Sequence, residues 1–146
     1  MLVYQFRVSI MGLARMYRLI EASEGCTFED LHQVIFEAFD RFDEHMYAFY
    51  LTKKDTKNIR CIWQSPEITH PEMLKEDLFF GDKKRMSSLE TNIGNIDLAE
   101  KDVFHYLFDF GDEWWHRIRV QEVRESKDEH KFIEIIKSVG SSPEQY

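Results

Sequence analysis

The chain has 146 residues, which fits one domain over residues 1–146 with a core that needs neither a disulfide nor a structural metal. Acidic residues outnumber basic ones by 27 to 19, and the net charge of −8 disfavours duplex nucleic acid as the main partner, because binding to phosphates requires a basic surface. No apolar run approaches the roughly 18 residues of a membrane span, and Cys26 and Cys61 form no short metal or redox motif, so we predict a cytoplasmic protein without a membrane partner.

Periodicity predicts two strands and then one principal helix in the first part of the chain. Apolar and polar residues alternate over 2–10 and 15–22, which is typical of neighbouring antiparallel strands joined by a short link. Apolar residues then recur at helical spacing over 27–40. Thr27, followed three residues later by Asp30, has the chemistry of a helix N-cap, so we expect the helix to begin there.

The middle of the chain has a weaker pattern. Residues 45–51 alternate and predict a third strand, and 59–64 fits a short strand. From 67 to 102, proline and glycine interrupt the pattern, and we expect only two short amphipathic turns, at 71–80 and 96–101.

The clearest strands are 103–110 and 114–123, which meet at the sequence FDFGDEWWH. A loop of three or five residues, Gly111 to Glu113 or one residue wider on each side, keeps acids and arginines off the apolar face and places Phe108 opposite His116. The inward face of this hairpin then carries Phe104, Tyr106, Phe108, Phe110, Trp114, His116, Ile118 and Val120, and its outward face carries His105, Asp109, Trp115, Arg117 and Arg119.

The later segment 131–139 fits a strand or a helix.

These elements together predict the fold class. We expect a single α+β domain in which a mainly antiparallel sheet carries one principal helix, at about 27–40, on one face.

Four segments carry a resemblance to a known family. MYRLIE, FEDLHQVIFEAF, FDEHMYAFYL and FHYLFDFGDEWWHRIRV, in this order over about residues 2–123, resemble the plasmid pRiA4b ORF-3-like family. Residues 124–146 then form a C-terminal extension whose last residues, SSPEQY, look like the start of a Pro-Glu segment of that family. The resemblance implies an α+β fold with an antiparallel sheet and no agreed activity.

Three histidines lie on the predicted inward sides of their elements. His32, His45 and His116, with Asp112 as an oxygen donor, form a candidate pocket, and converging imidazoles would suit a divalent transition metal. No two of them share a short ligand spacing, and the alternative is that each is a structural histidine that hydrogen-bonds the backbone around it. We therefore expect no cofactor and keep the metal as the alternative.

The outward face of the hairpin is a candidate partner surface. It consists of Trp115, Arg117, Arg119 and Asp109, and an exposed tryptophan beside an arginine can stack on a ring of a partner. Trp115 would equally fit beneath the middle segment of the chain. Asp109 and Asp112 suit turn chemistry, in which carboxylates accept hydrogen bonds from the turn amides.

Three functions follow from these features. The first is a small intracellular binding or accessory module for a protein or small molecule. The second is a metal-dependent hydrolase or nucleic-acid-processing enzyme that uses His32, His45 and His116. The third is a DNA-binding partner associated with mobile elements, which the net charge disfavours.

Overall fold

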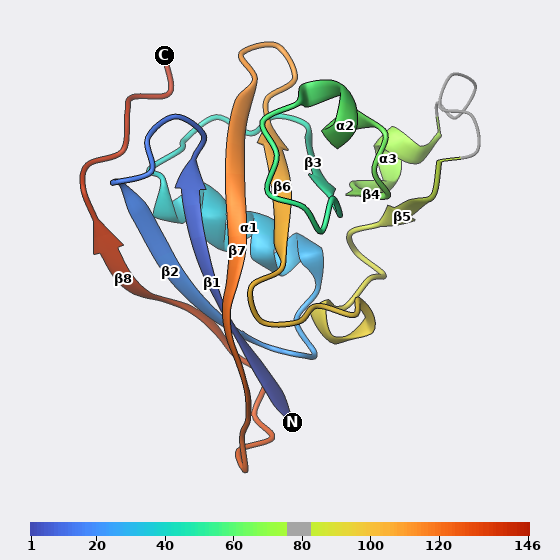
Figure 1. The fold of residues 1–146 in the computed structure, drawn as a ribbon, viewed down its shortest axis with the longest axis vertical. Coiled ribbons are helices and arrows are strands. Elements are labelled where there is room, and N and C mark those ends of the chain that lie inside the picture. Colours follow the sequence, from blue (N-terminus) through green and yellow to red (C-terminus); the bar gives the residue numbers. More distant parts are fainter. Residues whose placement is uncertain (76–82) are drawn as a thin grey trace.

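The computed structural model describes residues 1–75 and 83–146. Its strands are β1 (Leu2–Ile10), β2 (Tyr17–Ser23), β3 (Tyr47–Tyr50), β4 (Glu67–Thr69), β5 (Arg85–Ser87), β6 (Val103–Phe108), β7 (Trp114–Glu125) and β8 (Ile133–Val139). Its helices are α1 (Phe28–Ala38), α2 (Ile59–Trp63), α3 (Pro71–Leu74) and the 3-10 turn η1 (Ile93–Asn95). Over the described residues the strands form one sheet in the order β5-β4-β3-β6-β7-β1-β2-β8, antiparallel except between β4 and β5 (Figure 1).

The principal helix lies on one face of this sheet, as predicted. Thr27 caps α1, because its side chain accepts from the backbone N–H of Asp30 while the Asp30 carboxylate accepts from the backbone N–H of Thr27. The helix crosses behind the sheet in Figure 1 and buries Phe28, Leu31 and Ile35 against it. The predicted α+β class with a mainly antiparallel sheet is therefore confirmed.

The hairpin of β6 and β7 has the predicted faces but a different loop. Asp109 to Glu113 form a five-residue loop, so Phe108 pairs with Trp114 and not with His116, which pairs with Tyr106. The backbone of Asp109 takes a φ of 64°, and its Oδ1 accepts from the N–H groups of Gly111 and Asp112 at 3.0 and 3.3 Å. This turn chemistry centres the loop on Gly111 instead of Asp112 and shifts the pairing by two residues, so the residues of the two strands keep their predicted sides, whereas Phe110 leaves the inward set.

A second, smaller cluster packs on the opposite face of the sheet. Residues 59–64, predicted as a strand, form α2 instead, because the side chain of Asn58 caps it by accepting from the N–H of Cys61 at 3.2 Å. Phe110, expected on the inward face, lies with this second cluster because the loop begins before it. The cluster consists of Ala48, Tyr50, Ile62 and Leu107, with Phe110 and Trp115 packed against them.

The expectations for the segments 71–80, 96–101 and 131–139 are met in part. The expected turn at 71–80 contains α3, and its last residues, from 76 on, lie outside the described residues. The segment expected to form a turn at 96–101 has one only at its end, where the N–H of Asp102 donates to the carbonyl of Ala99 at 3.1 Å, and the 3-10 turn Ile93–Asn95 precedes the segment. The segment 131–139 is the edge strand β8.

The C-terminal extension adds an edge strand to the sheet and holds the segment that follows α1. β8 pairs with β2 at the edge of the sheet. Beyond it, the side-chain oxygen of Gln145 accepts from the N–H groups of Phe42 and Asp43 at 3.0 and 3.2 Å, and its amide donates to the carbonyl of Asp43. The final residues therefore fasten the segment that connects α1 to β3.

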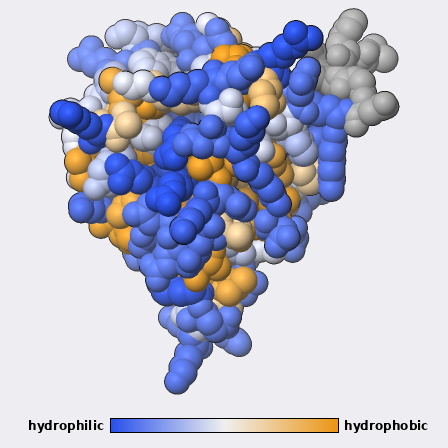
Figure 2. Space-filling view, in the orientation of Figure 1, coloured by the Kyte–Doolittle hydropathy of each residue, from blue (hydrophilic) through white to orange (hydrophobic). Residues whose placement is uncertain are grey.

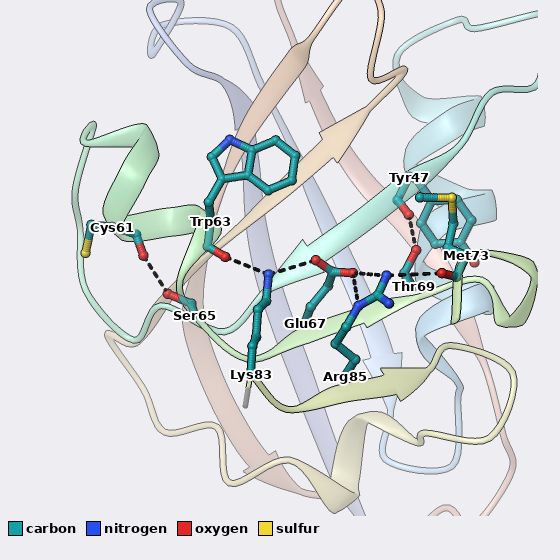
Figure 3. A network of polar contacts seen from close by, with 9 residues as sticks. All are labelled: Tyr47, Cys61, Trp63, Ser65, Glu67, Thr69, Met73, Lys83 and Arg85. Carbon is teal, nitrogen blue, oxygen red and sulfur yellow. Dashed lines mark hydrogen bonds and ion pairs between the residues drawn. The ribbon is translucent and has the colours of Figure 1, made fainter. Parts of the chain in front are cut away.

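A buried ion network joins the two parallel strands (Figure 3). The carboxylate of Glu67 in β4 accepts from Lys83 Nζ at 2.9 Å and from Arg85 Nε at 3.1 Å. Lys83 also donates to the carbonyl of Trp63, and Arg85 to that of Met73. The network thereby links α2, α3, β4 and β5.

Candidate functional site

A cleft of about 510 Å³ opens beside the first turns of α1. Its walls come from three places: α1 on one side, residues 44–47 leading into β3 on another, and the start of α3 on the third. Three carboxylates and three imidazoles line it: Glu29, Glu44, Glu72, His32, His45 and His70.

His32 forms the deepest polar part of the cleft. Its side chain is 1% exposed and stacks on the ring of Tyr47, with the ring centroids 3.6 Å apart. Its Nδ1 lies 2.7 Å from the Tyr106 hydroxyl, and its Nε2 lies 3.7 Å from Glu44 Oε2 at the cleft wall. Burial lowers the pKa of His32 to about 4, so the imidazole is neutral at pH 7.

Removal of the hydroxyl beneath His32 is expected to destabilise the protein. Tyr106→Phe leaves Nδ1 of a buried imidazole without its partner, which costs roughly 1–3 kcal/mol of the free energy of unfolding. Denaturant titration measures the loss. The control Tyr17→Phe, at a half-buried ring, is expected to change stability by less than about 0.5 kcal/mol, and an equal effect of both would contradict the role of the Tyr106 hydroxyl.

The carboxylates give the cleft a negative charge. Glu29 accepts a hydrogen bond from the Tyr47 hydroxyl, and Tyr47 also bonds the Ser88 hydroxyl at 2.6 Å. Glu44 has a 61% exposed side chain, and Glu72 pairs with the exposed Lys75 at 3.1 Å. No lysine or arginine of the described ranges lines the cleft itself.

The two other imidazoles lie at the rim. His45 Nε2 is 2.7 Å from the Tyr146 hydroxyl and 3.5 Å from Asp109 Oδ2. His70 caps α3, because its Nδ1 accepts from the N–H of Glu72 at 3.1 Å. The sequence reading missed His70, although its position directly before a proline is a helix-start signal.

The four predicted pocket residues lie in three places. His32 and His45 share the cleft, whereas His116 lies in the core with its Nδ1 2.9 Å from the carbonyl of Trp114 and its ring against Tyr106. Burial, and next the positive charge of Arg41, lower the pKa of His116 to about 3. Asp112 is exposed in the hairpin turn and is not among the residues that line the cleft.

The three predicted histidines are held by different partners. The ring nitrogens bond a tyrosine hydroxyl at His32, another at His45 and a backbone carbonyl at His116. Within residues 1–75 and 83–146, no group of three or more His, Cys, Asp or Glu side chains is placed to hold a metal ion. The metal-dependent enzyme therefore stays a prediction without a formed ligand set.

The predicted partner surface is partly covered. The ring of Trp115 lies 5.7 Å from that of Tyr50 and 6.0 Å from that of Trp63, so α2 packs over it. Arg117 binds Asp55 through two hydrogen bonds of 2.8 and 3.0 Å, and Arg119 is half-buried. Asp109, expected to point outward, is buried in the turn beside His45.

Fold and cleft together define an α+β domain with one principal helix and an acidic pocket at the helix start. The family model of the plasmid pRiA4b ORF-3-like proteins matches residues 2–145, nearly the whole chain. The chain belongs to this family, and the match extends past residues 2–123, where the motifs lie.

Comparison with solved structures supports the fold. The crystal structure of MM3350, a protein of unknown function from Methanosarcina mazei Go1, is similar with a TM-score of 0.69 and 23% sequence identity. The similarity covers 94% of this chain and 69% of that chain. No curated protein matches the sequence. In the described part of the chain, no helix has the length and apolar character needed to cross a membrane.

Proposed function

We propose that the protein is a binding module whose cleft beside α1 receives a basic group, an amine or a guanidinium, of a small molecule or a partner protein. One observation carries the proposal: Glu29, Glu44 and Glu72 line the cleft without a lysine or arginine among its described lining residues. The two free cysteines fit the cytoplasmic placement that the sequence predicts.

The electrostatics of the cleft favour a cation over an anion. Partial burial weakens the screening of a charge by water, so a carboxylate at the wall attracts a basic group more strongly than one on an open surface. His32 adds no opposing charge, because its low pKa keeps it neutral at pH 7. Its ring and that of Tyr47 supply flat surface on which a guanidinium can pack.

The volume of the cleft limits the size of the ligand. About 510 Å³ is within the usual range for small-molecule sites. A single lysine or arginine side chain, or a short diamine, would fit with room for part of its backbone or chain.

A calorimetric titration tests the proposal. Agmatine, which carries an amine and a guanidinium, is expected to bind, whereas glutarate, a dicarboxylate of similar length, is not. The variant Glu44→Gln/Glu72→Gln is expected to weaken agmatine binding by about tenfold or more, because it removes two of the three wall charges.

A matched control distinguishes the effect of the cleft carboxylates on agmatine binding from the effect of the net charge. Glu122 and Glu134 are exposed on β7 and β8, away from the cleft lining. Glu122→Gln/Glu134→Gln removes the same total charge and is expected to leave agmatine binding unchanged. Equal weakening by both double variants would contradict a specific site.

A further inference from the structure

A second cavity lies on the face of the sheet opposite α1. It has a volume of about 190 Å³ and lies between the end of β1, the loop at residues 55–57 and the middle of β6 and β7. Figure 2 views this face, on which hydrophilic side chains are spread between separate apolar spots. Unlike the cleft beside α1, this cavity is lined by two basic side chains, Lys57 and Arg117.

Neighbouring strands build the floor of the cavity. His105 of β6 pairs with Arg117 of β7, and Arg117 pairs with Ser9 of β1. Side chains that pair across adjacent strands project to the same face, about 5 Å apart. The sheet therefore fixes an imidazole, a guanidinium and a hydroxyl in one row.

The guanidinium of Arg117 already holds an oxyanion from the chain itself. Asp55 Oδ1 and Oδ2 accept from Arg117 Nε and NH2 at 2.8 and 3.0 Å, which is the two-pronged geometry that arginine forms with carboxylates and phosphates. Asp55 stands on a loop and its side chain is 59% exposed. An external oxyanion can therefore replace it without disturbing the core.

His105 supplies a buried imidazole next to this pair. The residue is 0% exposed, and its Nδ1 lies 2.8 Å from the Thr52 hydroxyl. The Thr52 hydroxyl donates to the carbonyl of Val103 at 3.3 Å, so it accepts from the Nδ1–H of His105 and leaves Nε2 as a hydrogen-bond acceptor. Nε2 has no hydrogen-bond partner in the described part of the chain.

The surroundings are locally positive on an acidic protein. Arg7 and Arg119 pair across β1 and β7, two residues along from Ser9 and Arg117 and on the same face. Neither arginine lines the cavity, but both add positive charge to the face around it, and its described lining contains one carboxylate, that of Asp55. A dianion gains more from this surface than the single charge of Asp55 does.

We propose that this cavity binds a phosphate group, which replaces Asp55 on Arg117 and Lys57. The phosphate is free inorganic phosphate or the terminal phosphate of a larger molecule, since both present the same oxyanion. Release of Asp55 moves the loop at 55–57 away from His105 and opens its Nε2 to the bound group. Asp55 is thus a built-in competitor for the site.

Because Asp55 competes with phosphate for Arg117, substitutions of these two residues are expected to change the phosphate affinity in opposite directions. Titrations with inorganic phosphate and with glycerol phosphate, at constant ionic strength, compare the wild type with Asp55→Asn and Arg117→Gln. Asp55→Asn is expected to bind phosphate at least about tenfold more tightly, and Arg117→Gln at least about tenfold more weakly, as expected for loss of charge-assisted hydrogen bonds. Tighter binding of glycerol phosphate than of phosphate identifies the larger molecule as the source, and the reverse identifies the free ion.

Two further variants show whether a change in phosphate binding comes from the site itself and not from a misfolded protein. Lys57→Gln changes an exposed loop residue and is expected to weaken binding, while Arg124→Gln, which removes an arginine paired with Glu21 at the far end of β7, is expected to leave it unchanged. The proposal is overturned if Asp55→Asn binds phosphate no more tightly than the wild type, or if Lys57→Gln and Arg124→Gln have equal effects.

Discussion

Replacement of Glu67 by glutamine is expected to lower the free energy of unfolding by roughly 3–5 kcal/mol, the usual cost of removing one member of a buried ion network. The side chains of Glu67, Lys83 and Arg85 are 3%, 9% and 4% exposed, so water cannot replace the lost carboxylate. Glutamine has the same shape but removes the negative charge that Lys83 and Arg85 share, which leaves the buried Lys83 ammonium without its carboxylate.

Denaturant titration of this variant has a matched control in the same part of the chain. Glu72→Gln breaks the exposed ion pair with Lys75, whose side chain is 71% exposed, and is expected to cost less than about 0.5 kcal/mol. Glu67→Gln/Lys83→Met is expected to recover part of the loss, because one unbalanced buried charge is removed as well. A loss at Glu67 as small as at Glu72 would show that the network contributes little to stability.

The second large effect is a loss of stability in acid. The pKa values of His32 and His116 are about 4 and about 3 in the folded protein, both below the ordinary value of 6.5. The unfolded chain therefore binds more protons than the folded one below pH 6.5. The stabilisation is complete above pH 6.5 and is lost as the pH falls towards the folded pKa values, at about 1.4 kcal/mol per pH unit for each histidine.

The contribution of one histidine can be isolated by substitution. His116→Asn retains an N–H that can donate to the carbonyl of Trp114 but has no titrating group. Between pH 6 and pH 5, the free energy of unfolding of this variant is expected to depend less steeply on pH than that of the wild type, by about 1.4 kcal/mol per unit. Identical slopes would mean that His116 takes up its proton without unfolding.

The sequence predicts the fold where pattern and chemistry agree. Thr27 and Asp30 mark the start of α1, and alternation assigns the faces of β6 and β7. The pairing of Phe108 was wrong by two residues because the side chain of Asp109 organises a loop centred on Gly111 instead of Asp112, which hydrophobic alternation does not report. The short apolar run at 59–64 fits a strand and a helix alike, and the cap at Asn58 decides between them.

The site is less visible in the sequence, because its walls come from distant segments. His32 and His45 were predicted and lie in the cleft, but Glu44, Glu72 and His70 owe their positions to the paths of the chain into β3 and α3. His116 shares a face with His32 but is separated from it by the ring of Tyr106. Periodicity places a residue on a face and does not say which neighbour stands between two residues of that face.

The central claim is that the acidic cleft beside α1 receives a basic group, and the most direct test maps where agmatine binds. In a nuclear magnetic resonance titration of the isotope-labelled protein, we expect the largest changes in backbone amide shifts at residues 29–32, 44–47 and 70–72, with saturation at one agmatine per chain. Added salt is expected to weaken the binding. Shifts that concentrate on the opposite face of the sheet, or that stay small and unsaturated at every residue of the cleft, would contradict the account.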